Sequence, residues 1–260
     1  RAVYDLLAAQ GPDGYIGTFE GDMRLVGAYD VWARQCTILG LTAYYDLTSD
    51  PSVLEAACRS LDCLIDELKQ RNLRLADLSW PRFMGLAPSV TVESGALLYQ
   101  RTGRQKYLDF AEQIVAQWHE PGQVAPNGLR LVEDALAGKP ATEIGYPKAY
   151  EQMYCFIGIC EMYRATGQRK YLDAAAALAK NIREEELFIT GTGSEGENWF
   201  KGRTQQTRIV FNPGETCVTT HWMYLCWQLL RLTGDPVYAD DLETSLYNAL
   251  LGALLPDGHW

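Results

Sequence analysis

The segment from Gly214 to Trp222 places a carboxylate, a thiol and an imidazole within a few residues of one another. We expect a helix to begin at Glu215 or Thr216, since the preceding Asn212-Pro213-Gly214 stops whatever comes before it. Unpaired backbone N–H groups at that helix start favour a thiolate, so the pattern predicts a lowered pKa for Cys217. Glu215 and Cys217 could supply two of the four ligands that zinc requires. An acidic residue complementing the helix dipole beside a buried cysteine would have the same pattern.

A second candidate is the glycine-rich stretch from Thr190 to Phe200. It lacks the Gly-Lys-Ser/Thr of a phosphate-binding loop, so nucleotide binding is not indicated. Glu197 stands beside Trp199 and Phe200, and apolar cover from these rings would raise its pKa, as a general acid requires. A glutamate of an ordinary surface loop is the alternative interpretation.

Composition narrows the class of protein. The chain has 260 residues, 47% of them hydrophobic, which is enough to bury a large core in one domain. Its net charge of −10 and the lack of a long basic stretch argue against nucleic acid as a partner. No apolar segment reaches membrane-spanning length, so no membrane partner is expected, and a cytoplasmic or periplasmic location and a homo-oligomer stay open.

The ends and the cysteines of the chain give two further expectations. The sequence begins at Arg1, already within a helical pattern, so we interpret residues 1–260 as a piece of a longer protein. Seven cysteines are an odd number, and four of them lie in apolar helical runs. We expect those four to be core residues rather than disulfide or metal partners: Cys58, Cys63, Cys155 and Cys160.

The elements that must position these residues are indicated by a repeat. Four times the sequence has a helical run ending at Thr-Gly, or Thr-Ser in the first copy, followed by a turn and a second helical run. Glycine supplies a left-handed helix end, and a polar turn residue can cap the next helix. Repeats of this kind predict stacked helical hairpins. The threonines that end the first helix of each hairpin are Thr48, Thr102, Thr166 and Thr233.

Long loops separate the hairpins, at Leu75 to Pro88, Pro121 to Pro147 and Phe188 to Pro213. Hairpins with long loops on one rim suit a closed ring of paired helices, an all-α (α/α) toroid, and such loops are where sites are usually built. An open superhelix used for protein binding is the alternative architecture.

Polar and aromatic residues recur where the first helix of a hairpin begins. The expected helix from Ala28 to Tyr45 carries Asp30, Trp32 and Arg34 near its start. Lys148, Tyr150, Glu151 and Gln152 occupy the matching place before a later apolar run, and Glu93 does so in between. In a toroid these side chains would converge on the axis, although a solvated rim would have the same pattern.

Several motifs together resemble glycoside hydrolase family 127, typified by β-L-arabinofuranosidases. Gly214-Glu215-Thr216-Cys217 followed by Trp222 is the most specific of them. The others are Gln10 to Gly17, Ile189 to Glu197, Gln228 to Asp235, Tyr238 to Asp240, Leu246 to Leu250 and Pro256 to Gly258. The resemblance implies an (α/α)6 barrel, in agreement with the repeat, and covers nearly the whole chain.

The resemblance also implies site residues. Glu215 and Cys217 would bind Zn²⁺ together with two adjacent cysteines further along the family's sequence, one of which is the nucleophile. Glu197 would be the general acid/base, with Glu195 the weaker candidate, and Glu215 would also act in catalysis by tuning the charge of the ion. The adjacent cysteines are absent here. We therefore expect residues 1–260 to be one incomplete catalytic domain, inactive alone, without the Cys-Cys segment and some N-terminal helices.

The implied reaction is hydrolysis of a terminal sugar from a plant or microbial glycan with retention of configuration. Trp32, Tyr150 and Trp199 are candidates for stacking on the sugar, and Asp30 and Lys148 for polar contacts with it. The resemblance places Ser89 and Lys148 where that group has sugar-contacting histidines, so the identity of the sugar is open.

Two other functions are compatible with the repeat. A toroid that catalyses polysaccharide elimination or sugar epimerisation would usually need a histidine or tyrosine base, but His119, His221 and His259 lie in no convincing loop. A non-catalytic helical scaffold would bind no metal and would tolerate changes at Glu215 and Cys217.

Overall fold

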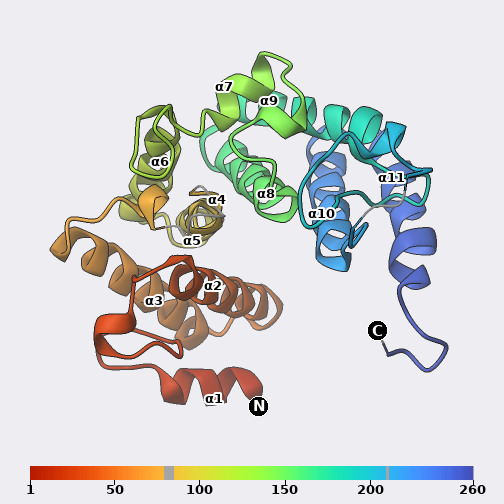
Figure 1. The fold of residues 1–260 in the computed structure, drawn as a ribbon. Helices are drawn as coiled ribbons and strands as arrows, with labels where there is room; N and C mark the ends of the chain where they lie inside the picture. The colour runs from red at the N-terminus through yellow and green to blue at the C-terminus, as the bar shows by residue number, and fades with distance from the viewer. Residues whose placement is uncertain (79–84, 209–210, 260) are drawn as a thin grey trace. The chain divides into compact units, whose positions relative to one another are not determined.

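A computed structural model of the chain describes residues 1–78, 85–208 and 211–259 (Figure 1). These residues form helices joined by loops and short 3-10 turns, and over the described ranges strand pairing is limited to isolated bridges. The all-α expectation is therefore confirmed. None of the described helices is long and apolar enough to cross a membrane.

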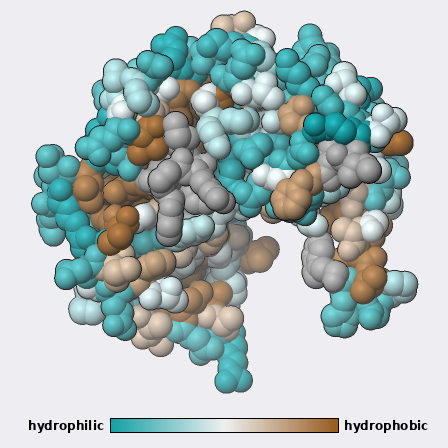
Figure 2. Space-filling view, viewed as in Figure 1, coloured by the Kyte–Doolittle hydropathy of each residue, from teal (hydrophilic) through white to brown (hydrophobic). Residues whose placement is uncertain are grey.

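The chain divides into two compact units, Arg1–Leu129 and Arg130–Trp260. The interpretation of residues 1–260 as one domain stays a prediction. In the view of Figure 2, hydrophilic residues cover much of the visible surface and hydrophobic ones are scattered among them.

Unit 1 consists of two helical hairpins preceded by a short helix. In the first hairpin α2 packs against α3, in the second α5 packs against α6, and α2 also contacts α5 (Figure 1). Part of the predicted loop from Leu75 to Pro88 is helical, and residues 79–84 lie outside the described ranges. The helices are α1 (Ala2–Ala9), α2 (Ala28–Thr48), α3 (Pro51–Gln70), α4 (Leu86–Ser89), α5 (Val92–Thr102) and α6 (Gln105–His119).

Unit 2 is arranged around α8, whose residues from Glu151 to Met162 are all buried. Because this part of the helix has no exposed face, it must be covered on every side, and α9 and α10 both pack against it. The described helices of this unit are α7 (Leu131–Leu136), α8 (Ala149–Thr166), α9 (Arg169–Asn181), α10 (Thr216–Thr233) and α11 (Val237–Thr244); π-helical turns continue α9 through Ile182–Glu186 and α11 through Ser245–Leu250.

All four predicted hairpin turns are present. The residue after each repeat threonine is left-handed, with φ of 56° at Ser49 and 66°, 69° and 71° at Gly103, Gly167 and Gly234. Of these four positions, only the first forces a side chain into a region that glycine enters freely.

The repeat threonine itself joins the two helices of each hairpin. The Thr102 hydroxyl donates to the Leu98 carbonyl at 2.6 Å and accepts the Arg104 N–H at 3.1 Å. Thr48, Thr166 and Thr233 make the same two bonds at 2.7–2.8 Å and 3.2–3.3 Å. One hydroxyl thus adds a bond to a carbonyl in the last turn of the first helix and pairs an N–H at the start of the second.

The predicted capping of the second helix by a polar turn residue holds only in part. Asp50 accepts the Ser52 N–H at 2.9 Å before α3, and Asp235 accepts the Val237 N–H at 3.0 Å before α11. Arg104 and Gln168 make no side-chain cap before α6 and α9. The threonine bond is therefore the element common to all four turns.

The four cysteines expected in the core are buried there, and all seven cysteines are free thiols. Large side chains are also buried in each unit, among them Tyr107 and Trp118 in unit 1 and Phe156 and Trp222 in unit 2.

Candidate active site

Glu197 lies at the tip of a tight turn. The N–H and carbonyl groups of Glu195 and Asn198 bond to each other at 2.9 and 3.1 Å, and the two residues between them have φ of 52° and 73°. Positive φ at both central positions is the requirement of a type I′ hairpin turn. The first is Gly196, but Glu197 itself sits in a region that costs a side-chain-bearing residue of order 1–3 kcal/mol. Such strain at a candidate catalytic residue is typical of functional sites.

The loop carrying this turn is bridged on both sides to the start of a helix. On one side the Ala149 N–H donates to the Glu197 carbonyl at 2.9 Å, and Lys148 forms an isolated bridge with Asn198. On the other side the Gly214 N–H donates to the Ser194 carbonyl at 3.1 Å. The loop therefore brings the starts of α8 and α10 to one place in unit 2.

Lys148 precedes α8 and is only 6% exposed. Its ammonium group forms an ion pair with Glu197 Oε2 and lies 3.6 Å from Glu151 Oε1. Desolvation alone would lower the pKa of Lys148, but the carboxylates of Glu197, Glu151 and Glu215 outweigh it and raise that pKa. Burial raises the pKa of Glu151 to about 7, against the opposing effect of Lys148. One ammonium group therefore lies among three carboxylates.

Glu215 is the N-cap residue of α10 and Cys217 lies in its first turn, as predicted. The Cys217 Sγ is 3.5 Å from Glu215 Oε2. The prediction of a lowered pKa is wrong: desolvation, followed by the Glu215 carboxylate, raises the pKa of Cys217 to about 12. These two effects exceed the influence of the helix end, so the thiol stays protonated unless a cation compensates the charge.

The aromatic cover expected over Glu197 is not there. Its side chain is 51% exposed and faces Lys148, whereas Trp199 is 2% exposed and donates from its indole nitrogen to Gln152 Oε1 at 2.9 Å. Trp199 thus anchors the loop from inside and is not presented for stacking on a sugar. Glu195, the weaker acid/base candidate, is held by Arg208 at 2.5 Å and by the Phe211 N–H at 3.2 Å.

A model of the β-L-arabinofuranosidase GH127 catalytic domain matches residues 1–260. The chain belongs to this family. A non-reducing end β-L-arabinofuranosidase of Bifidobacterium longum subsp. longum is 24% identical over 285 residues, which cover 98% of this chain and 42% of that protein. The chain thus spans about two fifths of the length of this curated relative.

Solved structures support the same class of fold. A GH127 β-L-arabinofuranosidase of Geobacillus stearothermophilus T6 has a TM-score of 0.69 and 19% identity, covering 98% of this chain and 43% of that one. An inactive variant of the α-1,6-mannanase GH76A of Salegentibacter sp. HEL1_6 has a TM-score of 0.62 and 15% identity, with 98% and 71% covered. At these identities the likeness shows the fold, and it confirms the predicted (α/α) toroid class.

Tyr150 and His221 lie beside the carboxylates of Glu151, Glu197 and Glu215, here called the acidic cluster. Their ring centroids are 3.9 Å apart, and Tyr154 lies 4.8 Å from the same imidazole. Tyr150 keeps part of its surface exposed, so it stays a candidate for contact with a sugar. Burial lowers the pKa of His221 from 6.5 to about 4, which keeps the imidazole neutral at physiological pH.

His221 should make the stability of the GH127 domain sensitive to acid. Above pH 6.5 the imidazole is neutral in both the folded and the unfolded chain. Between pH 6.5 and pH 4 only the unfolded chain binds the proton, so the free energy of unfolding decreases as the pH falls. Between about pH 8 and pH 5 we expect the free energy of unfolding to fall by about 2 kcal/mol more in wild type than in His221→Gln. Urea unfolding with a chelator present measures the difference. His259→Gln, at an exposed site, is the matched control, and equal losses in wild type and His221→Gln would contradict the prediction.

The sequence did not single out Glu186, which bonds to the loop that carries Glu197, here called the site loop. This buried carboxylate accepts the N–H groups of Phe200 and Lys201 at 2.9 and 2.7 Å. Burial raises its pKa, against these bonds. It lies in the π-helical turn after α9, among the run Glu184 to Glu186, and nothing in that run distinguishes the buried glutamate from its two neighbours.

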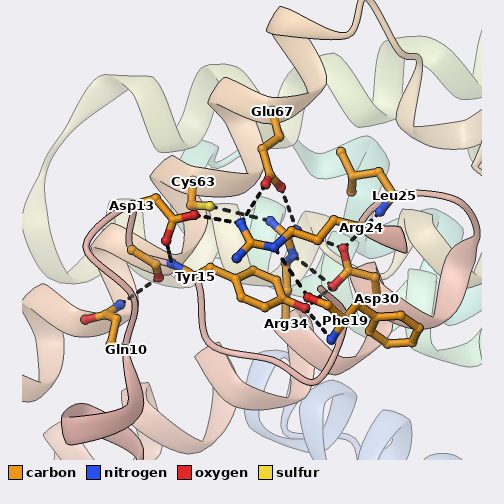
Figure 3. A network of polar contacts seen from close by, with 11 residues as sticks. Gln10, Asp13, Tyr15, Phe19, Arg24, Leu25, Asp30, Arg34, Cys63 and Glu67 are labelled. Carbon is orange, nitrogen blue, oxygen red and sulfur yellow. Dashed lines mark hydrogen bonds and ion pairs between the residues drawn. The ribbon is translucent and has the colours of Figure 1, made fainter. Parts of the chain in front are cut away.

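Asp30 belongs to a separate polar network in unit 1 (Figure 3). Its carboxylate is 1% exposed and bonds to the Tyr15 hydroxyl at 2.8 Å, the Leu25 N–H at 3.1 Å and the Arg34 guanidinium at 2.7 Å. These protein donors occupy both oxygens, so Asp30 has a structural role and its predicted sugar contact gains no support here. Trp32 is partly exposed, and its contact with sugar stays a prediction.

The same network contains a group of side chains with metal-ligand character, Asp13, Cys63 and Glu67. The Arg24 guanidinium lies among them, 2.6 Å from Asp13 Oδ2 and 3.1 Å from Glu67 Oε1 (Figure 3). Arginine therefore already supplies the positive charge that a metal ion would bring, and we assign no metal there.

Removing the buried cation of this network should destabilise unit 1. Arg34 is fully buried and pairs with Asp30 at 2.7 Å and Glu67 at 2.6 Å, so Arg34→Met leaves the buried Asp30 carboxylate without an ion-pair partner and Glu67 with Arg24 alone. We expect a loss of about 3 kcal/mol in the free energy of unfolding, measured with urea. Arg169→Met, which breaks the exposed pair with Asp173, is the control and should change nothing measurable. Equal stability of the two variants would contradict the structural role.

Proposed function

We propose that this chain is part of a zinc-dependent, retaining glycoside hydrolase that releases terminal β-L-arabinofuranosyl groups from glycans. The observation that carries the proposal is that one loop of a GH127 domain brings Glu197, Glu215 and Cys217 to the same site. The curated relative named above is described as a β-L-arabinofuranosidase acting at non-reducing ends, which supports the choice of sugar.

The residues at the start of α10 fit a zinc site. Ligands at zinc–sulfur and zinc–oxygen bond lengths in a tetrahedral arrangement lie about 3.6 Å apart, and Cys217 Sγ and Glu215 Oε2 are 3.5 Å apart. The surplus of carboxylates around Lys148 also favours a dication. When bound, zinc would stabilise the Cys217 thiolate and hold it in place. The family resemblance assigns the remaining two ligands to adjacent cysteines, which are not in this sequence.

In this proposal Glu197 moves a proton in both halves of the reaction. Its exposed carboxyl group would protonate the oxygen of the leaving group as the glycosidic bond breaks, and would then take a proton from the water that releases the sugar. Retention requires a nucleophile on the opposite face of the sugar, which the family resemblance assigns to a cysteine outside residues 1–260. Tyr150, which is partly exposed at the start of α8, is our candidate for contact with the ring.

The experiment uses the full-length protein. Aryl β-L-arabinofuranoside would be hydrolysed in parallel with aryl α-L-arabinofuranoside and aryl β-D-xyloside, with proton NMR following the first-formed product. We expect hydrolysis of the β-L-arabinofuranoside with the β-anomer formed first. Initial formation of the α-anomer would exclude retention, an unsaturated product would indicate elimination, and no turnover of any glycoside would remove the hydrolase proposal.

A further inference from the structure

The Lys148 ammonium group lies between two carboxylates of different exposure. Glu197, its ion-pair partner, is 51% exposed at the tip of the site turn, whereas the Glu151 side chain, 3.6 Å away, is only 7% exposed. The Lys148 side chain is itself 8% exposed, so water screens its interaction with the buried Glu151 poorly and reaches its pair with Glu197 from the Glu197 side.

Glu151 has unused capacity to accept a hydrogen bond. Its Oε2 atom is buried and has no hydrogen-bond partner. A buried carboxylate with an unsatisfied oxygen is costly, and a nearby ammonium group is the partner that would relieve it. Glu151 lies one turn into α8, so it can receive this ammonium group without movement of the helix.

The backbone fixes the distance over which Lys148 would move. Lys148 is the residue before α8, its bridge to Asn198 holds the turn of Glu197 in register, and the Ala149 N–H binds the Glu197 carbonyl. Both carboxylates are thus held on the framework that carries the lysine, and rotation about the lysine side-chain bonds alone exchanges one for the other.

We propose that Lys148 is a positioning residue for Glu197 and a counter-ion that Glu197 shares with Glu151. When Glu197 is ionised, the ammonium group pairs with it; when Glu197 carries a proton, the ammonium group moves to Glu151. The inference rests on the proposed function, since it takes Glu197 as the general acid/base.

The proton and the bonding electrons follow the ordinary course of a retaining hydrolysis. As a thiolate nucleophile bonds to the anomeric carbon, the electrons of the glycosidic bond pass to the leaving oxygen, which takes the proton of Glu197. Lys148 keeps its three protons and turns to the new carboxylate. Water then attacks the anomeric carbon and displaces the thiolate, Glu197 receives the proton of that water, and Lys148 returns to Glu151.

The test measures kcat and KM of the full-length enzyme on an arabinofuranoside with an alkyl leaving group, which needs acid catalysis most. Lys148→Met should lower kcat roughly 10- to 100-fold with KM changed less than about threefold, and Lys148→Arg should restore most of the loss. Glu151→Gln, a nearly isosteric change, should lower kcat about tenfold while the fold is kept. Lys139→Met, which breaks a partly exposed pair with Asp134 in the same unit, is the control.

The decisive comparison is made in a Glu197→Gln background. If Lys148 acts through Glu197, adding Lys148→Met or Glu151→Gln to Glu197→Gln should change kcat less than about twofold. The inference is overturned if these changes cost as much in that background as in wild type, or if they raise KM and leave kcat unchanged. An inactive wild type would instead remove the proposed function, so the two failures are distinguishable.

Discussion

Glu197→Gln in the full-length enzyme is expected to lower kcat/KM about 1,000-fold on arabinofuranosides with a poor leaving group. Glutamine keeps the shape of the type I′ turn tip but cannot deliver a proton to the leaving oxygen. The measurement is steady-state kinetics on a series of arabinofuranosides with leaving groups from alkyl alcohols to dinitrophenol. Because a good leaving group needs no proton, the loss should shrink along the series.

Two comparisons make this expectation specific to Glu197. Azide, a nucleophile that needs no base, should restore turnover of activated substrates by Glu197→Gln and yield the arabinosyl azide. Glu195→Gln is the matched control, since Glu195 is engaged by Arg208 and the Phe211 N–H, and it should cost less than about tenfold. A larger loss at Glu195 than at Glu197 would transfer the acid/base role to Glu195.

Cys217→Ser should remove the metal from the full-length protein. We expect about one zinc ion per chain in freshly reduced wild type and less than about 0.1 in the variant, because serine offers no thiolate and zinc favours sulfur at such sites. Elemental analysis of the purified proteins measures the content. Activity should fall together with the zinc content, because the variant loses both the Cys217 thiolate and the positive charge of the ion beside the carboxylates around Lys148.

Cys36→Ser is the matched control, because Cys36 is the other exposed cysteine and lies on α2 of unit 1. It should retain the zinc content of wild type. Zinc retained by Cys217→Ser would refute the assignment of the ligand, and a reduced wild type without zinc would refute the metal-dependent mechanism itself.

The features that the sequence predicted well are those specified by neighbouring residues. The four turns, the start of α10 at Thr216 and the buried positions of Cys58 and Cys155 follow from glycine, capping residues and apolar spacing. The meeting of Lys148 with Glu197 was not predicted, because the recurrence of polar residues at helix starts concerned Lys148 and not the loop that carries Glu197. The bridges between that loop and the start of α8 bring the two side chains together.

The features that could not be predicted depend on what surrounds each side chain. Desolvation reverses the expected direction of the pKa shift at Cys217, although the helix end is where it was expected. Packing decides which way a side chain points. Trp199 therefore donates to Gln152, and the Asp30 carboxylate pairs with Arg34. No local pattern separates the buried Glu186 from its exposed neighbours.

The recurring threonine turn makes the junction inside each hairpin independent of the loops outside it. Since one hydroxyl and a left-handed residue set the junction between its two helices, a hairpin keeps its geometry whatever loop precedes or follows it. Insertions between hairpins, as in the site loop, can therefore reshape a binding rim while helix pairing is preserved. Exchange of these loops between related chains therefore offers a practical way to vary the residues around the candidate site while the helix pairs are kept.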